Sequence, residues 1–221
     1  MAKVGVLTIG QSPRTDATPS FQKIFGADVE IVERGGLDRL TEETMDAIKP
    51  EGSDTVYISR LRNGQSVEIG KSKLLPLLQD ELTKLEQDVE VVIMLCTGDF
   101  PTLVTTKPII YPDKILVHTV QAIMTGGSKL GLVVPLEKQR HSLAKKWEGV
   151  GLELVTAAAS PYEESDIAGA AASLKEQGAE LIVLDCMGYN ETHKLEAKKG
   201  SGLPVILPRT LVARIAAEYV F

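Results

Sequence analysis

EVVIMLCTG at residues 90–98 and ELIVLDCMG at residues 180–188 are two versions of one pattern, in which an apolar run ends at a cysteine and a glycine follows two residues later. Two further blocks repeat in the same order. Residues 3–14 (KVGVLTIGQSPR) match residues 129–140 (KLGLVVPLEKQR), and residues 107–112 (KPIIYP) match residues 203–208 (LPVILP). The repeat predicts a chain built from two related halves, which meet near Gly126 and Gly127.

Apolar runs of strand length alternate with helix-like patterns along both halves. Thr18 before Pro19 predicts the start of a short helix, and leucines at helical spacing predict a second one from about 72 to 87. We expect further helices after Thr41 and from a capping box at 160–163, with Ser165 as the alternative start. Strands are expected at residues 3–8, 29–33, 55–60, 66–69, 89–95, 130–134, 152–156, 181–184 and 205–207. This alternation is typical of an α/β fold with mainly parallel sheets that helices cover on both faces.

One segment departs from the alternation. Asn63-Gly64 lies between two strand-like runs and is a strong signal for an antiparallel turn. We therefore expect a β-hairpin inserted near residues 54–70, which could decorate a sheet edge, act as a lid or contact a second copy of the chain. The predicted domains are a first α/β lobe at residues 1–126, which carries the hairpin, and a second lobe at residues 127–221, whose C-terminal helix can pack back on the first.

Composition excludes several classes of protein. The chain has 24 Lys and Arg against 30 Asp and Glu, a net charge of −6, which argues against a binder of nucleic-acid backbones. A small anion can still bind in a local pocket. No apolar run approaches the ~18 residues of a membrane span, no signal peptide is visible, and two cysteines are too few for a disulfide scaffold. We expect a soluble, globular, cytoplasmic protein with no membrane or nucleic-acid partner.

The two cysteines are the predicted catalytic residues. In parallel sheets, ligands bind beyond the carboxyl ends of the strands, where Cys96 and Cys186 are expected. Gly98 and Gly188 allow backbone amides to turn inward and hold a carboxylate. One thiolate could then remove a proton from the carbon beside that carboxylate while the other thiol returns one on the opposite face. Such chemistry requires no metal or organic cofactor, and the alternative is a pair of buried structural cysteines.

Several neighbouring side chains are predicted to support this site. Arg14 could hold a carboxylate through both arms of its guanidinium or pair with Asp16, and the Thr97 hydroxyl could bind the ligand or stabilise its own turn. Asp185 could orient a thiol or cap a helix, and His193 is a further acid/base candidate, whereas His118 and His141 have no metal-site spacing. The residues predicted to contact the ligand are Gln11, Ser12, Arg14, Thr97, Gly98, Met187, Gly188 and Tyr189, the last of which could instead serve packing.

Four segments carry a resemblance to a known family. TIGQSPR at 8–14, LCTGDFP at 95–101, LDCMGY at 184–189 and PVILPRTLVARIAAE at 204–218 resemble the AroM protein family. AroM proteins are in turn similar to the aspartate/glutamate racemase superfamily, which includes hydantoin racemases, maleate isomerases and arylmalonate decarboxylases. The resemblance implies two pseudo-symmetric, Rossmann-like lobes with an active cleft between them, and it assigns the superfamily's two cysteine positions to Cys96 and Cys186. Racemases usually carry a hydroxyl or small residue after each cysteine, so Met187 departs from their pattern and argues against an amino-acid substrate.

The leading hypothesis is a cofactor-independent racemase or isomerase of a small carboxylate that uses two-cysteine acid/base chemistry. A second hypothesis has Cys186 alone reactive, in a decarboxylase or a cis-trans isomerase. A third is a non-catalytic sensor of small carboxylates linked to aromatic amino-acid metabolism. The AroM family has no settled activity that would decide between them, and superfamily precedent implies a homodimer.

Overall fold

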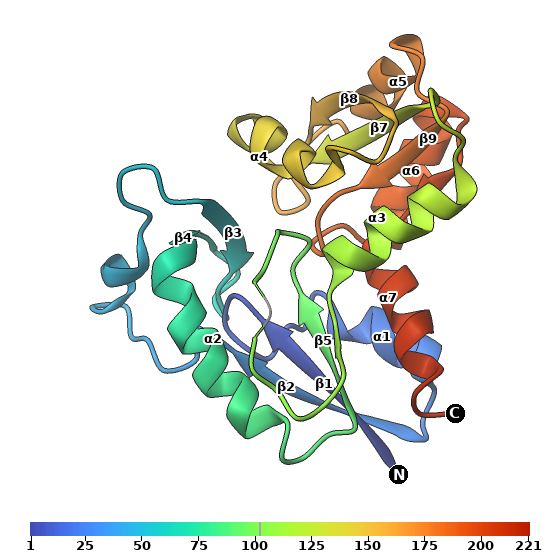
Figure 1. Ribbon diagram of the computed structural model, residues 1–221. Helices are drawn as coiled ribbons and strands as arrows, with labels where there is room; N and C mark the ends of the chain where they lie inside the picture. Colours follow the sequence, from blue (N-terminus) through green and yellow to red (C-terminus); the bar gives the residue numbers. More distant parts are fainter. Residues whose placement is uncertain (102) are drawn as a thin grey trace. The chain divides into compact units, whose positions relative to one another are not determined.

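The computed structural model describes residues 1–101 and 103–221 and divides into two compact units. The first unit contains Met1–Cys96, Phe100–Tyr111 and Val212–Phe221, and the second contains Thr97–Asp99 and Pro112–Leu211 (Figure 1). The units are thus discontinuous along the chain, unlike the single boundary near residue 126 that the repeat suggested. Helix α3 (Pro112–Ile123) belongs to the second unit, and the last ten residues, which include most of α7 (Pro208–Ala217), belong to the first.

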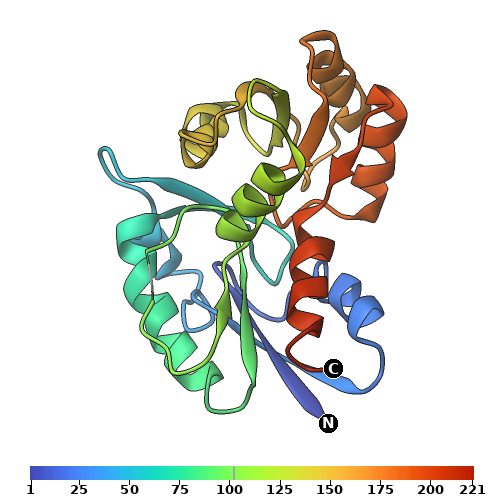
Figure 2. The same ribbon diagram turned by 45° about the vertical axis from the view of Figure 1, so that its right-hand side comes forward.

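The first unit is built on a parallel sheet with strand order β2-β1-β5-β6. Its strands are β1 (Ala2–Thr8), β2 (Val29–Gly35), β5 (Val91–Leu95) and β6 (Ile109–Ile110). Helices α1 (Thr18–Phe25) and α2 (Lys71–Leu85) lie on opposite sides of it, as both ribbon views show (Figure 1, Figure 2). The fully buried Leu74, Leu78 and Leu82 of α2 form one core cluster with Leu7 and Met94 of the sheet. These strand residues therefore face α2, on one side of a sheet that helices cover on both faces.

The predicted hairpin is confirmed as a separate two-stranded sheet. Strands β3 (Val56–Arg60) and β4 (Ser66–Gly70) pair antiparallel around the Asn63-Gly64 turn. The helix expected after Thr41 is wrong, because only a single 3-10 turn, η1 (Met45–Ile48), forms there. The Thr44 hydroxyl accepts the Thr41 N–H at 2.9 Å, so the chain closes a local turn instead of opening a helix.

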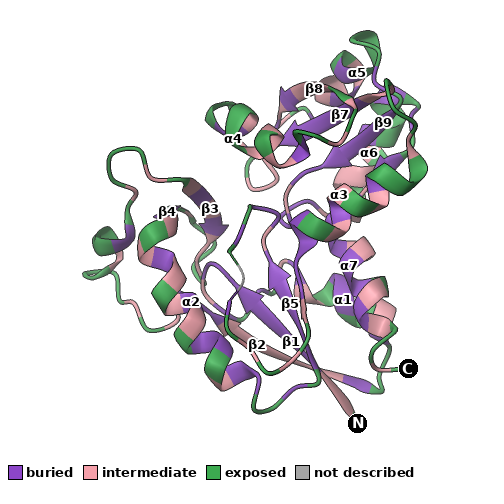
Figure 3. Ribbon diagram, viewed as in Figure 1, coloured by how far each residue is buried: buried purple, intermediate pink, exposed green. Residues whose placement is uncertain are grey.

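The second unit repeats this design with strand order β10-β9-β7-β8. Its strands are β7 (Lys129–Val134), β8 (Glu153–Ala158), β9 (Leu181–Leu184) and β10 (Val205–Ile206). Val133 packs with α5 (Ile167–Glu176) and α6 (Glu191–Ser201) on one face, whereas Leu132 and Val134 pack with α3 and Trp147 on the other. Figure 3 shows the strands β7 and β9 as largely buried segments. The remaining elements of this unit are η2 (Glu137–Gln139), α4 (Arg140–Ala144) and η3 (Lys145–Trp147).

The internal repeat is confirmed in the topology. Read from its other edge, the second sheet runs β8-β7-β9-β10, which is the order β2-β1-β5-β6 of the first. The register also repeats, because Glu90 N–H donates to Lys3 O at 2.9 Å and Glu180 N–H donates to Lys129 O at 2.9 Å. The third repeated block forms β6 and β10, although its first copy had not been predicted as a strand. Such a short strand has too few residues for its own alternation to be readable.

Helix α5 begins later than its sequence suggested. The capping box predicted at 160–163 is wrong, since Asp166 is the N-cap and its carboxylate accepts Gly169 N–H at 2.7 Å. Residues 160–165 instead form a loop, in which Ser165 Oγ donates to Ser160 O at 2.7 Å and Tyr162 N–H donates to Ser160 Oγ at 3.2 Å. A carboxylate makes a stronger cap than a hydroxyl here because the helix dipole favours negative charge. The consequence is that Tyr162 lies in a loop.

No helix among residues 1–101 and 103–221 combines the length and the apolar character that crossing a membrane would require.

Candidate active site

Both cysteines follow the carboxyl ends of equivalent strands. Cys96 comes directly after β5, and Cys186 follows β9 after one intervening residue. Each is half-buried, and neither is in a disulfide. Cys96 packs against the apolar core of the first unit and Cys186 against a core of the second. Both sulfurs are thus partly covered by apolar side chains and partly accessible.

Two polar groups lie close to the sulfur of Cys186. The Gly188 N–H donates to Cys186 Sγ at 3.3 Å, and the Tyr162 hydroxyl lies 3.9 Å from the same atom. Glycine at 188 leaves room for the Tyr162 ring, because a Cβ there would lie 2.6 Å from both Cζ and Oη of Tyr162. The Cys186 sulfur is therefore contacted by one backbone N–H and one phenol hydroxyl of the second unit.

Asp185, directly before Cys186, belongs to a buried ion pair. Its Oδ1 lies 2.5 Å from Lys146 Nζ, and the side chains are 0% and 7% exposed. The Trp147 indole N–H donates to the other carboxylate oxygen at 3.3 Å. Of the two roles considered for Asp185, capping a helix is therefore wrong. Its charge is instead compensated inside the protein by Lys146. Sequence alone gave no sign of Lys146, which looks like one more surface lysine beside Lys145.

Thr97, directly after Cys96, joins the same cluster within the second unit. Its hydroxyl donates to Asp185 O at 3.1 Å, and its carbonyl accepts Lys146 Nζ at 2.7 Å. Thr97 is 3% exposed, so its hydroxyl fixes the loop, which is the turn-stabilising alternative. The residue after one cysteine is thus hydrogen-bonded to the residue before the other. Gly98, the next predicted ligand contact, is buried as well.

Asp113 lies at the start of α3, near this cluster. Its side chain is 6% exposed, and Oδ1 has no hydrogen-bond partner among the described residues. Burial raises the pKa of Asp113 above its ordinary value, and the Asp99 carboxylate raises it further, although the Lys114 N–H and Lys146 oppose both. The structure therefore holds an acid that is easier to protonate than usual.

Arg209 supports the loop that follows Cys186. The arginine is 1% exposed, and its Nε and Nη2 donate to Met187 O at 3.1 and 2.7 Å. Nη2 also donates to Gly188 O at 3.1 Å. Met187 is itself 2% exposed, so a packing role accounts for its side chain better than the predicted ligand contact. Arg209 lies in the repeated segment at the end of the chain, but its spacing from Cys186 gave no signal.

Tyr189 and His193 complete the second cysteine loop without facing a ligand. Tyr189 is fully buried and donates to Ala159 O at 2.5 Å. Burial first, and then the nearby Cys186, raises the pKa of Tyr189 well above its ordinary value. His193 Nδ1 accepts the Asn190 N–H at 3.1 Å in the capping box of α6, and burial lowers the pKa of His193. Tyr189 thus serves packing, and the nitrogen that His193 would need as a base already caps the helix.

The polar side chains after β1 are engaged within the first unit. Arg14 is 3% exposed, and its Nε and Nη2 donate to the two oxygens of Asp16 at 2.7 and 2.8 Å. The guanidinium that was expected to hold a substrate carboxylate therefore holds Asp16, which is the alternative weighed from the sequence. Ser12 Oγ donates to Asp38 Oδ2 at 2.6 Å, and Gln11 Nε2 donates to Leu37 O at 3.3 Å.

The hairpin is attached to this same loop. Arg62, beside the hairpin turn, pairs with Asp38 at 2.8 Å and donates its backbone N–H to Gln11 Oε1 at 3.1 Å. Gly10 allows the close approach, since a Cβ there would lie 2.5 Å from Arg60 O. The hairpin therefore braces the loop after β1.

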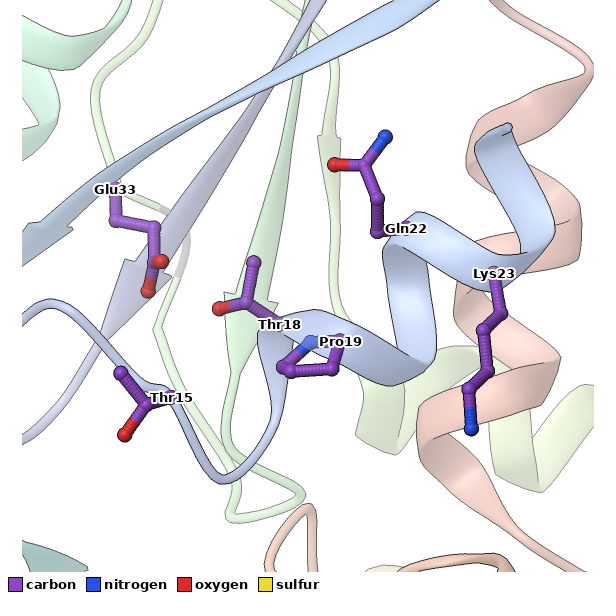
Figure 4. A pocket seen from close by; sticks show the side chains of 6 residues that line it. All are labelled: Thr15, Thr18, Pro19, Gln22, Lys23 and Glu33. Carbon is purple, nitrogen blue, oxygen red and sulfur yellow. The ribbon is translucent and has the colours of Figure 1, made fainter. Parts of the chain in front are cut away.

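The first unit also has a hollow of about 600 Å³ next to α1. Its lining residues are Thr15, Thr18, Pro19, Gln22, Lys23 and Glu33, which come from α1, the segment before it and strand β2 (Figure 4). None of the predicted site residues lines this hollow. Within the described part of the chain, no group of three His, Cys, Asp or Glu residues is arranged to hold a metal ion.

Solved structures with this fold catalyse different reactions. Glutamate racemase isoform RacE1 from Bacillus anthracis matches with a TM-score of 0.63 and 14% identity over 98% of this chain and 80% of that one. Arylmalonate decarboxylase matches with a TM-score of 0.58 and 13% identity over 99% and 92%. A mutant of the maleate cis-trans isomerase of Nocardia farcinica, with a covalently bound succinylcysteine intermediate, matches with a TM-score of 0.60 and 14% identity over 99% and 92%. At these identities the matches establish the fold, which is the predicted one.

Sequence comparison gives the family. No curated protein matches the chain. The family model described as AroM protein matches residues 4–220, which confirms the resemblance found in the four segments. The chain belongs to the AroM family.

Proposed function

We propose that the protein is a cofactor-independent racemase or isomerase of a small carboxylate, with Cys96 and Cys186 as its acid and base. The observation that carries the proposal is the equivalent placement of two half-buried cysteines after β5 and β9 of a structural repeat. The bond from Thr97 to Asp185 adds support, because it joins the residues beside the two cysteines. Relatives by fold that are named as racemases and isomerases are consistent with this class of reaction.

The chemistry needs one thiolate and one thiol. A free thiol has a pKa of about 8.5, and hydrogen-bond donors near the sulfur lower it. With Cys186 as thiolate, its sulfur takes the proton from the carbon beside the carboxylate and leaves an enolate. The Cys96 thiol then gives its proton to the opposite face of that carbon. The reaction ends with Cys186 as thiol and Cys96 as thiolate, so it runs equally well in reverse.

The loops at Gly98 and Gly188 supply the expected seat for the carboxylate. Backbone amides of these loops other than Gly188 N–H, which donates to Cys186 Sγ, would donate to the carboxylate and to the charge that develops on the enolate. Met187 offers no hydroxyl next to Cys186 and is packed inward, so nothing at that position favours an amino group on the substrate. We therefore propose a small acid that does not need an α-amino group for recognition.

A second function is favoured by the surroundings of Cys186. Gly188 and Tyr162 both reach its sulfur, which suits a single reactive thiol. Such a thiol could add to a double bond, as the succinylcysteine in the Nocardia farcinica enzyme suggests, or protonate an enolate after decarboxylation. In that mechanism Cys96 has no chemical role.

Deuterium exchange separates these hypotheses. The protein is incubated in heavy water with pooled single enantiomers of amino, hydroxy and shikimate-pathway acids, and inversion with deuterium uptake at the carbon beside the carboxylate is followed. We expect inversion that is lost in both Cys96→Ser and Cys186→Ser, since one face of the carbon then lacks its acid or base. Turnover that survives only in Cys96→Ser supports the single-cysteine function. Binding of an acid that never exchanges or reacts would overturn both and leave the sensor.

A further inference from the structure

Tyr162 is the polar side chain whose hydroxyl approaches Cys186 Sγ, at 3.9 Å. We propose that Tyr162 is a further catalytic residue, whose phenol O–H donates to the Cys186 thiolate and stabilises it whenever Cys186 has given up its proton. The catalytic meaning of this contact rests on the proposed function. The contact itself, and its effect on the thiol, do not.

The chain builds a dedicated loop to bring Tyr162 to this position. After β8 ends at Ala158, the segment 160–165 is closed by the bond from Ser165 Oγ to Ser160 O at 2.7 Å. The Ser160 hydroxyl accepts the Tyr162 N–H at 3.2 Å and fixes the backbone of the tyrosine. Helix α5 starts only at Ile167, so the phenol ring is not carried away along a helix.

Gly188 makes room for the ring and adds a second donor. A Cβ at 188 would lie 2.6 Å from Tyr162 Oη and 2.8 Å from Cε1, so only glycine permits this packing. The Gly188 N–H reaches the same sulfur at 3.3 Å. One glycine therefore serves both hydrogen bonds, and the two donors converge on one atom.

The acidities of the phenol and the thiol decide which group donates the hydrogen bond between Tyr162 and Cys186. An ordinary phenol has a pKa of about 10 and a thiol about 8.5, so the phenol keeps its proton when the thiol loses its own. Before Cys186 takes a proton from the substrate carbon, and again in the reverse direction once it has given one up, its thiolate accepts the Tyr162 O–H, and the proton stays on the phenol oxygen. No net proton reaches or leaves Tyr162, which acts as a fixed donor.

Three ionisable groups in the segments beside Cys186 already have partners of their own. Asp185 is paired with Lys146, the Tyr189 hydroxyl donates to Ala159 O, and Arg209 donates to the carbonyls of Met187 and Gly188. Removal of the Tyr162 hydroxyl therefore changes one donor to the sulfur and leaves these contacts in place.

The test is the pH dependence of alkylation at Cys186. Wild type, Tyr162→Phe and the exposed control Tyr219→Phe are treated with iodoacetamide from pH 6 to 10, and each cysteine peptide is quantified by mass spectrometry. In Tyr162→Phe we expect the midpoint for Cys186 to rise by about half to one pH unit and its alkylation at neutral pH to slow by ~3–10-fold, as the loss of one hydrogen bond implies. Cys96 serves as the internal reference and should keep its midpoint. Tyr219→Phe should match wild type.

A second variant keeps the test decisive. Gly188→Ala retains the backbone N–H but displaces the phenol ring, so we expect the same direction of shift. The double variant Tyr162→Phe/Gly188→Ala should show no further shift, because the hydroxyl can be lost only once. An unchanged midpoint for Cys186 in Tyr162→Phe, or an equal shift at Cys96, would overturn the proposal. This measurement involves no substrate, so its failure is distinct from a failure to find inversion.

Discussion

Asp113 and Arg209 occupy the same position in the two halves of the repeat and carry opposite charges. Each follows the proline that begins its helix, Pro112 for α3 and Pro208 for α7. Arg209 is fully buried and donates to the carbonyls of the Cys186 loop, whereas Asp113 is buried with one oxygen that has no hydrogen-bond partner among the described residues. The two halves therefore share their strands and their cysteines, but they differ in the side chain that follows the first proline of α3 and of α7.

The residues before the cysteines differ in the same way. Leu95 precedes Cys96 as an apolar strand residue, whereas Asp185 precedes Cys186 as a buried charge that requires Lys146. A buried ion pair is costly to form and much more costly to break. We infer that the second half has the more polar and more specialised cysteine loop, and that changes there have the larger effects.

Lys146→Met should give the largest loss of stability. The change leaves the Asp185 carboxylate buried without its counter-ion, which should cost about 3–5 kcal/mol in the free energy of unfolding. Denaturant unfolding measures it, with the exposed neighbour Lys145→Met as the matched control. A loss no larger than that of the control would contradict a structural ion pair at this position.

Arg209→Met should come next. Three donated hydrogen bonds to two buried carbonyls disappear, and we expect a loss of about 2–3 kcal/mol in the free energy of unfolding, together with faster alkylation of the Cys186 thiolate at alkaline pH as its loop becomes more accessible. Arg214→Met, on the exposed side of the same helix, provides the control. If Arg209→Met loosened Cys96 more than Cys186, the assignment of this arginine to the second loop would be wrong.

Asp113→Asn should have a small effect of opposite sign. Because burial raises the pKa of Asp113, the folded state holds its proton more tightly than the unfolded state does, so this group contributes stability at low pH that is lost as pH rises through its folded-state pKa. The uncharged amide of the Asp113→Asn variant does not ionise, so this fall in stability with rising pH disappears. The variant should be more stable than the wild type at pH 7 by up to about 1 kcal/mol, with little gain near pH 3. Unfolding curves at the two pH values measure the difference. Destabilisation at pH 7 would show that the carboxylate is well compensated.

The repeat explains how much of the fold was readable from sequence. Matched blocks around Cys96 and Cys186 predicted two related α/β halves, because the same strand patterns recur in the same order along the chain, and Asn63-Gly64 predicted the hairpin from its turn chemistry alone. The predicted boundary between the lobes near residue 126, in contrast, differs from the division into two units. Contacts decide where a unit ends, and the chain passes between the units more than once.

The residues that support the site were harder to predict. Lys146 is distant in sequence from both Asp185 and Thr97, so its partners become visible only once the sheet is assembled. Tyr162 was assigned to a helix cap because Ser160 and Glu163 have the right spacing, but Asp166 provides the stronger cap and leaves the tyrosine in a loop. For Arg14 the sequence left two partners open, and burial next to Asp16 favours the internal one.

The proposed reaction requires the thiols of Cys96 and Cys186 to serve one small substrate. A short bifunctional thiol reagent tests it directly: the native protein is treated, digested and analysed by mass spectrometry, with Cys96→Ser and Cys186→Ser as controls. We expect an intramolecular link between the peptides of Cys96 and Cys186 in the wild type, formed at low protein concentration and blocked by a bound acid. Single modification of each thiol, without a link, would contradict it.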